Sequence, residues 1–332
     1  MPFFDLETSI PFRIHPRAED VHVWHLNWLQ EMGLISEPKV AQDYSRQGAV
    51  SAMTYIFPQI PYSGLCLAAD MAGITVFLDD YCSVHAKAPE RVVRLVTSLV
   101  AVTLDPIESH HQMSNPIVRA WLHAWKRYGE GMSSRWREKT QQTWHEFLTA
   151  WIDEAAIQVQ GSYMDLDAYF QIRRRAIGVR PFIDVAQWAL GLELPPALAD
   201  HPTTQKALDA CTDVCIYIND IFSLERELAA EEKNNFVLII QQQNGFSYEQ
   251  SLEFSIKKCI DSYRIFELDK DELSLLAVSE YERRAINSYI DLLCGFIKGS
   301  HDWSSQVERY KTPADSLSSA SYLTRCEYLS NT

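Results

Sequence analysis

Three oxygen-bearing side chains recur at intervals of four residues in an otherwise apolar stretch. Asn219, Ser223 and Glu227 lie within "CTDVCIYINDIFSLERELAAEEKNNFVLII", residues 211–240. In a helix, steps of four residues advance about 40° around the axis and about 6 Å along it, so the three side chains share one face. An amide oxygen, a hydroxyl and a carboxylate suit Mg²⁺ or Mn²⁺ better than zinc. The spacing therefore favours a divalent-cation site, although the same pattern also arises on a solvated helix face.

A pair of neighbouring acids raises the same question earlier in the chain. Asp79 and Asp80 end the apolar run "LCLAADMAGITVFLDD", residues 65–80. Adjacent carboxylates repel each other, and removing them from water is costly unless a cation compensates their charge. The pair is therefore a second candidate cation site, and the alternative is an acidic helix end that faces solvent.

Basic side chains gather in "QIRRRAIGVRP", residues 171–181, which contains Arg173, Arg174 and Arg175. Arginine can bind phosphate oxygens through two parallel hydrogen bonds. Consecutive residues of a helix point about 100° apart, so at most one or two of the three can enter the same cleft. A phosphate-binding role for one of them competes with a solvated basic turn.

The elements that must position these side chains are predicted to be helices. The chain has 332 residues, of which 47% are hydrophobic, and this is enough for a sizeable core in one large domain or two ordinary ones. Apolar residues follow the 3.6-residue period nearly throughout, and no segment shows the alternation of a strand. No break is long enough to be a linker. We therefore predict a single all-α domain over residues 1–332, a bundle of roughly ten helices, with a polar tail after about residue 313.

The expected helices and their interruptions can be placed along the chain. The apolar stripes are clearest in "AEDVHVWHLNWLQEMGLI" and "TQQTWHEFLTAWIDEAA". Further helices are expected at 40–55, 115–135, 203–230, 247–266 and 277–298. Breaks are expected at 58–61, 85–89, 106–116, 195–202, 244–247 and 269–271.

Charge and composition argue against several classes of function. The formal net charge of −14 disfavours non-specific binding of nucleic acid, which needs clustered Lys and Arg. No run approaches the 18 or so apolar residues that cross a bilayer, and the N-terminus has no apolar region of a secretory signal. The seven cysteines contain no C-x-x-C pair and are expected to be reduced. We therefore predict a cytoplasmic protein with no stable membrane insertion and no nucleic-acid partner.

The motifs, taken in order, resemble the class I terpene synthases of microbial single-domain type, and the sesquiterpene synthases among them. "NDIFSLERE" matches that family's N-D-x-x-S-x-x-x-E pattern at every defined position, and "FLDD" is similar to its aspartate-rich motif. Arg173 precedes Asn219 by close to the family spacing. In "WSSQVERYKTP", Arg309 and Tyr310 follow Trp303 as in the family's terminal Arg-Tyr pair. The resemblance covers most of the chain, including the N-terminal segment "IPFRIHPRAEDVHVWHLNWLQEMGLI".

The resemblance implies a helical bundle with a central active-site cavity and a metal-dependent reaction. The expected reaction is the ionisation and cyclisation of a linear prenyl diphosphate, with farnesyl diphosphate expected and geranyl or geranylgeranyl diphosphate as alternatives. Three Mg²⁺ ions are expected, with Mn²⁺ as a substitute, and a homodimer would be in keeping with the family. A chain-elongating prenyl diphosphate synthase and a non-catalytic helical scaffold remain as alternative functions.

The resemblance also implies a role for each matching residue. The expected metal ligands are Asp79, which would bind two ions, and Asn219, Ser223 and Glu227, which would hold the third. The expected diphosphate-binding residues are Arg173, Arg226, Arg309 and Tyr310. The expected catalytic residues are Asp79, Arg173 and Tyr310. Asp80 would pair with an arginine, Arg309 being the candidate.

The remaining expectations concern the walls of the cavity. The residues predicted at or near it are Phe57, Val76, Phe77, Ile177 and Trp303. The segment 173–178 resembles the family's hinge, where a helix break moves with the diphosphate-sensing arginine. The chain departs from the family at Ser83, where a third acid is usual, and this puts an outer contact of the motif in question.

Overall fold

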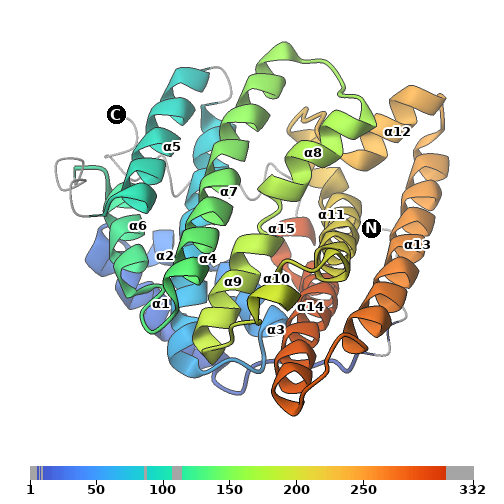
Figure 1. The fold of residues 1–332 in the computed structure, drawn as a ribbon. Helices are drawn as coiled ribbons and strands as arrows, with labels where there is room; N and C mark the ends of the chain where they lie inside the picture. The colour runs from blue at the N-terminus through green and yellow to red at the C-terminus, as the bar shows by residue number, and fades with distance from the viewer. Residues whose placement is uncertain (1–5, 7, 9, 86–87, 107–113, 312–332) are drawn as a thin grey trace.

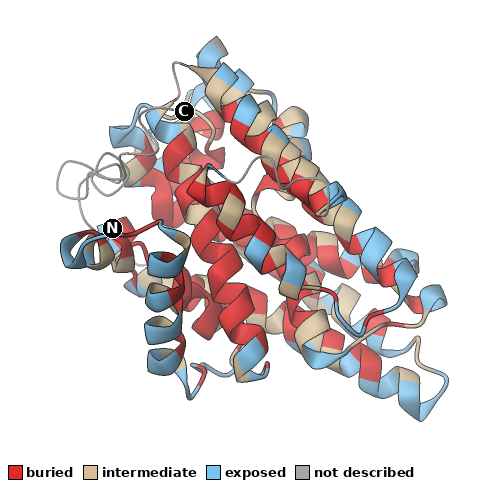
Figure 2. Cartoon of the chain, turned by 90° about the vertical axis from the view of Figure 1, so that its left-hand side faces the viewer, coloured by how far each residue is buried: buried red, intermediate tan, exposed pale blue. Residues whose placement is uncertain are grey.

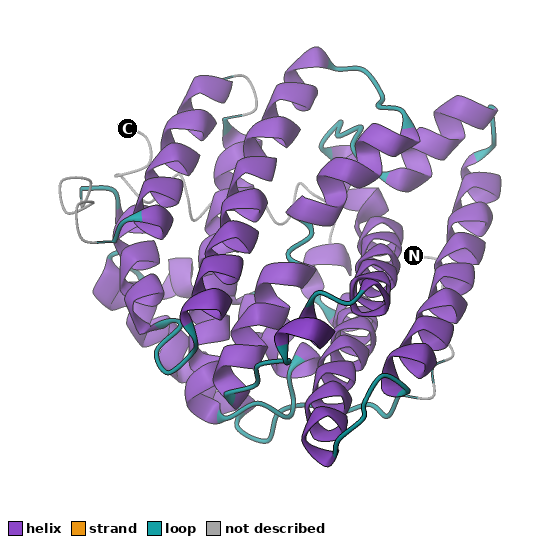
Figure 3. Cartoon of the chain, in the orientation of Figure 1, coloured by secondary structure: helices purple, strands orange, loops and turns teal. Residues whose placement is uncertain are grey.

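The computed structural model describes residues 6, 8, 10–85, 88–106 and 114–311, and within them the chain is helical with no strand (Figure 1, Figure 3). The helices are α1 (Ala18–Met32), α2 (Pro38–Ser45), α3 (Ala49–Ile56), α4 (Tyr62–Val84), α5 (Pro89–Leu104), α6 (Pro116–Arg127), α7 (Ser134–Gln160), α8 (Leu166–Ala176), α9 (Val179–Leu190), α10 (Pro196–Ala199), α11 (Pro202–Ala229), α12 (Phe236–Asn244), α13 (Tyr248–Ser274), α14 (Glu280–Gln306) and α15 (Glu308–Lys311). The all-α prediction is confirmed. The predicted tail lies outside the described residues.

Two long helices occupy the middle of the bundle. Helix α4 packs against α1, α3, α6 and α9, and helix α11 packs against α8, α9, α13 and α14. Most residues of both helices are buried on all sides, which is the pattern of a core helix rather than of a surface helix. Figure 1 shows α13 along the outer side of α11, and Figure 2 shows the buried positions concentrated in the central helices. The two helices that carry the acidic and polar motifs are therefore enclosed by the others.

Local signals explain where several helices begin. Proline stands in the first turn of α2, α5, α6 and α11, where its missing N–H leaves no hydrogen bond unmade. Helices α13 and α14 begin with capping boxes, in which Ser247 and Ser279 exchange hydrogen bonds with Gln250 and Glu282.

Three predicted boundaries are wrong in detail. The stretch 115–135 contains a turn, because Gly129 and Gly131 adopt positive φ between the end of α6 and the start of α7. The stretch 40–55 is divided at Gly48, between α2 and α3. No break occurs at 269–271, since α13 runs on to Ser274. Its charged residues there are good helix formers, so polarity alone does not end the helix.

None of the helices in the described residues combines the length and the apolar character needed to cross a bilayer.

The end of α11 generates a prediction about stability. Glu231 has a φ of 57°, and it is the one described residue other than glycine with a positive φ. Its N–H donates to the Leu228 carbonyl at 3.2 Å, and the Glu232 N–H donates to the Glu227 carbonyl at 2.9 Å. These two bonds form the helix-ending motif in which glycine is the usual residue.

We expect Glu231→Gly to raise the free energy of unfolding by about 0.5–1 kcal/mol, because glycine adopts the left-handed conformation without the steric cost that a Cβ atom imposes. Part of this gain is lost, since glycine also increases the conformational entropy of the unfolded chain. Urea denaturation would measure the change, with Glu231→Ala as the matched control that keeps the penalty. A glycine variant no more stable than the alanine variant would contradict this account of the helix end.

Candidate active site

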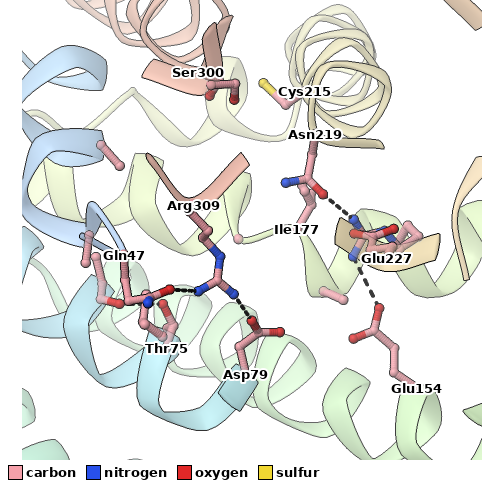
Figure 4. Close-up of a pocket in the computed structure, with 18 of the residues that line it drawn as sticks. Gln47, Thr75, Asp79, Glu154, Ile177, Cys215, Asn219, Glu227, Ser300 and Arg309 are labelled. Carbon is pink, nitrogen blue, oxygen red and sulfur yellow. Dashed lines mark hydrogen bonds and ion pairs between the residues drawn. The ribbon is translucent and has the colours of Figure 1, made fainter. Parts of the chain in front are cut away.

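A cavity of about 400 Å³ lies inside the bundle, and eight helices contribute to its wall. Those helices are α3, α4, α7, α8, α9, α11, α14 and α15, together with the turn before α3 and the residues that follow α11. Figure 4 shows Asp79, Arg309, Asn219, Glu227 and Glu154 around it. The two candidate cation sites and the predicted arginine therefore open into one space.

The two acids of α4 differ in burial, since the side chain of Asp79 is 31% exposed at the cavity wall and Asp80 is buried. Asp79 lines the cavity and accepts a hydrogen bond from Nη2 of Arg309, while Nη1 of Arg226 lies 3.9 Å from its carboxylate. Asp80 is 1% exposed, and neither of its carboxylate oxygens has a hydrogen-bond partner. Burial, opposed by Arg309 and reinforced by Asp79, raises the pKa of Asp80 to about 7. The alternative of a solvent-facing acidic helix end is wrong.

Asp80 lies close to the arginine that was predicted to pair with it. Its Oδ1 is 3.7 Å from Nη2 of Arg309, whereas the hydrogen bond of that nitrogen goes to Asp79. The helix continues beyond the pair to Val84, which places Ser83 at the cavity wall, one turn after Asp79.

The polar residues of α11 reach the same region from the opposite side of the cavity. Oδ1 of Asn219 accepts from Nη2 of Arg173 at 2.9 Å, and its Nδ2 donates to the Tyr310 hydroxyl at 2.9 Å. Oε2 of Glu227 accepts from Nδ2 of Asn235 at 2.8 Å. Ser223, which stands between Asn219 and Glu227 in the sequence, is fully buried and is not among the residues that line the cavity. Its Oγ has no hydrogen-bond partner.

These groups fit a hard divalent cation. Ser223 Oγ and both oxygens of Asp80 are buried acceptors without a donor, and such atoms are costly unless something satisfies them. The described residues contain no cluster of three or more His, Cys, Asp or Glu that could hold a metal. The candidate set on α11 is not of that kind, since two of its three members are an amide and a hydroxyl. Mg²⁺ is typically bound by one or two carboxylates, with phosphate and water oxygens completing its shell.

Of the three consecutive arginines, Arg173 alone lines the cavity. Besides its bond to Asn219, it donates from Nη1 to Glu154 at 3.3 Å and from Nη2 to Asp220 at 3.2 Å. Arg174 forms two bonds of 2.7 Å with Asp213, outside the cavity. Arg175 bonds Asp153 at 2.7 Å. The 100° step between neighbours thus separates the three as predicted.

The C-terminal Arg-Tyr pair also enters the cavity. Arg309 and Tyr310 are both buried in α15, and Trp303 packs edge-on against the Tyr310 ring with 5.6 Å between ring centroids. Arg226, one residue before Glu227, lines the cavity as well. Nearby carboxylates, chiefly Asp79 and Glu227, outweigh the burial that opposes charging and raise the pKa of Arg226, so it remains a cation.

Sequence reasoning missed several polar groups of the site. Glu154 of α7 and Glu232, just after α11, line the cavity, and burial raises the pKa of both carboxyls, that of Glu232 to about 8. Asp220 is fully buried and accepts from the Tyr169 hydroxyl and from the Phe236 N–H at 2.6 Å. A signal for Glu154 exists in the sequence, since it continues the helical stripe of Phe147 and Trp151 into the cavity.

The rest of the wall is mainly apolar. The aromatic residues that line it are Phe147, Trp151, Phe182, Phe296, Trp303 and Tyr310. Val76 and Ile177 line it as predicted. The predicted helix break is present, since α8 ends at Ala176 and α9 begins at Val179 after Gly178, whose φ is 83°.

Two predicted cavity aromatics lie elsewhere, and this part of the prediction is wrong. Phe77 is about 160° around the helix from Asp79, so it points away from the cavity and stacks on Tyr44 at 5.1 Å. Phe57 caps the end of α3 and is fully buried behind the cavity-lining Phe296, with 5.6 Å between the ring centroids.

Comparison with known proteins identifies the family to which the chain belongs. Residues 70–264 match the model of terpene synthase family 2, C-terminal metal binding, and the chain belongs to this family. Pentalenene synthase of Streptomyces avermitilis is 28% identical, with 99% of each chain aligned. A 7-epi-α-eudesmol synthase of Streptomyces viridochromogenes, described as cyclising (2E,6E)-farnesyl diphosphate, is 24% identical over 92% of this chain and 91% of its own.

The fold is also similar to that of solved terpene synthases. Linalool/nerolidol synthase from Streptomyces clavuligerus, solved in complex with 2-fluorogeranyl diphosphate, superimposes with a TM-score of 0.80 at 24% identity, over 88% of this chain and all of that chain. The predicted class I terpene synthase resemblance is thus confirmed.

The different positions of the three arginines generate a prediction. Arg173→Lys should lower the release of diphosphate from a prenyl diphosphate by about 100-fold or more, because one ammonium cannot replace the guanidinium contacts to three partners. Arg174→Lys should do less and Arg175→Lys least, since their ion pairs lie outside the cavity. The three variants would be assayed together, and the greatest loss in Arg175→Lys would contradict the assignment.

Proposed function

We propose that the protein catalyses the Mg²⁺-dependent ionisation and cyclisation of a linear prenyl diphosphate, farnesyl diphosphate, to a terpene hydrocarbon or alcohol. The observation that carries this proposal is the meeting of Asp79, Asn219 and Glu227 with three arginines on the wall of one largely apolar cavity. Such a cavity can hold an anionic head group and a hydrocarbon chain at the same time.

The polar residues would bind the diphosphate and hold its leaving oxygens. Breaking the bond between carbon and oxygen leaves the electron pair on the diphosphate, so the site must stabilise a charge that grows in the transition state. Mg²⁺, when bound, would supply Lewis-acid neutralisation of that charge. Asp79, Asn219, Ser223 and Glu227 would be its ligands.

The cationic and hydroxyl side chains would act on the same group. We propose that Arg173, Arg226 and Arg309 bind diphosphate oxygens and that the Tyr310 hydroxyl donates a hydrogen bond to one of them. All four line the cavity, and guanidinium groups match the geometry of phosphate oxygens.

The apolar wall would control what happens to the carbocation. The aromatic faces of Trp151, Phe147 and Phe182 can stabilise positive charge, and the apolar surroundings keep water from quenching it early. The reaction ends when the cation loses a proton or takes up water, which yields a hydrocarbon or an alcohol.

The choice of farnesyl diphosphate rests on the related 7-epi-α-eudesmol synthase, whose description names that substrate. Geranyl diphosphate is the second candidate, because the structurally similar linalool/nerolidol synthase was solved with a fluorinated geranyl diphosphate. Chain elongation is disfavoured, since α11 carries Asn219 and Ser223 where an elongating enzyme would need a second aspartate-rich motif.

We include four further points in the same proposal: three bound Mg²⁺ ions, Mn²⁺ as a substitute, a homodimer and a cytoplasmic location. The number of ions rests on the family resemblance, in which Asp79 would bind two ions and Asn219, Ser223 and Glu227 would hold the third. The last two rest on the family resemblance and on composition alone.

The proposed reaction can be tested on the purified chain. We expect Mg²⁺-dependent release of diphosphate from farnesyl diphosphate without any isopentenyl diphosphate, and a terpene product detected by gas chromatography. Chelation of the metal should abolish release. Release that requires isopentenyl diphosphate would indicate chain elongation, and no release from C10, C15 or C20 substrates would contradict the proposed function.

The role proposed for Asp79 generates a separate prediction. Asp79→Asn should lower diphosphate release by about 100-fold or more, because it removes the charge of a ligand shared by two ions. Asp200→Asn, which removes an exposed carboxylate paired with Arg135, is the matched control and should retain activity. Activity like that of the unaltered protein in Asp79→Asn would remove this residue from the site.

A further inference from the structure

The short turn between α2 and α3, residues 46–48, is joined to the C-terminal helices. Nε1 of Trp303 donates to the Gly48 carbonyl at 3.0 Å and to Oγ of Ser51 at 3.1 Å. A Cβ atom at Gly48, whose φ is 78°, would lie 2.6 Å from Cγ2 of Val307 and 2.9 Å from the Trp303 ring nitrogen. The turn is therefore held tightly against the segment that leads to Arg309.

Gln47 is the residue of this turn that reaches the cavity. It is 3% exposed, lines the cavity, and accepts a hydrogen bond through Oε1 from Nη1 of Arg309. The other terminal nitrogen of the same guanidinium, Nη2, donates to Asp79 (Figure 4). Arg309 is thus held between a neutral amide on one side and a carboxylate on the other.

The two partners of Arg309 differ in what they would do when a cation and a diphosphate arrive. A cation bound to Asp79 competes with Arg309 for the same carboxylate oxygens, so Nη2 must give up that bond. Gln47 carries no charge and is not a metal ligand of the proposed site, so its bond to Nη1 can persist. Because Gln47 is neutral, it does not compete with an anion for the positive charge of Arg309, as Asp79 and Asp80 do.

We propose that Gln47 is a positioning residue, which holds the Arg309 guanidinium in place while its Nη2 exchanges Asp79 for an oxygen of the diphosphate. The inference rests on the diphosphate site of the proposed function and adds a residue from an element that carries none of its motifs. A neutral acceptor is required at this position, because a carboxylate would hold Arg309 by charge and repel the diphosphate.

Binding of inorganic diphosphate in the presence of Mg²⁺, measured by calorimetry, tests the inference without turnover. Gln47→Leu should weaken binding about tenfold, which is the scale of one hydrogen bond to a charged group. Gln47→Glu should weaken it further, although it is closest in shape to the native residue. If Gln47 served packing alone, Gln47→Glu would rank nearest to the unaltered protein, and that order would overturn the proposal.

Two further variants complete the test. Gln242→Leu makes the same substitution on the exposed face of α12 and should leave binding unchanged. Gln47→Leu should add little to the loss caused by Arg309→Gln, because it acts through that side chain. A full tenfold further loss in the double variant, or unchanged binding in Gln47→Leu alone, would overturn the proposal.

The outcome is separable from that of the proposed function. Terpene formation by the unaltered chain, together with unchanged diphosphate binding in Gln47→Leu, would overturn the role of Gln47 and leave the proposed function standing. The opposite result is also possible: the Gln47 and Arg309 variants lose diphosphate binding in a coupled way, but the unaltered chain releases no diphosphate from any prenyl substrate. That result would support the role of Gln47 and contradict the proposed reaction.

Discussion

The structure depends on compensation of buried negative charge. Asp79, Glu154 and Glu227 line one cavity inside a helical bundle, together with Glu232, whose pKa is raised to about 8 by burial. Asp80 is buried next to Asp79 and has no hydrogen bond. Carboxylates at this density are costly to remove from water unless cations lie beside them. In the structure the cations are arginines, which arrive from α8, α11 and α15. Their contacts with α4, α7 and α11 therefore join the helices that enclose the cavity.

The same charge compensation explains how the site can be stable without ligands and still have groups available for a metal and a diphosphate. Arg309 bonds Asp79, and Tyr310 bonds Asn219, so the C-terminal pair occupies groups from both candidate metal motifs. In the proposed function, each of these bonds would be exchanged for a bond to a metal or to a diphosphate oxygen. The arginines would then lose a carboxylate and gain a phosphate oxygen, while the bound cations would take over the carboxylates.

Much of this arrangement follows from helical geometry and could be predicted. The spacing of Asn219, Ser223 and Glu227 places them on one face of α11, and the 100° step singles out Arg173 among its neighbours. The same geometry would have excluded Phe77, because it lies nearly opposite Asp79 on α4. Glu154 and Gln47 could not be assigned with equal ease. Each comes from an element without a motif. The stripe of Phe147 and Trp151 indicates which face of α7 carries Glu154, whereas nothing near Gln47 does the same, and the place of both residues opposite the motifs depends on how distant helices pack.

The most direct test of the central claim is a crystal structure of the chain with Mn²⁺ and inorganic diphosphate, in which anomalous scattering locates the metal. The account predicts Mn²⁺ at Asp79 and at the Asn219, Ser223 and Glu227 group, with the diphosphate between them and Nη2 of Arg309 moved from Asp79 to a phosphate oxygen. A diphosphate bound away from these residues, or a metal that leaves both groups untouched, would contradict it.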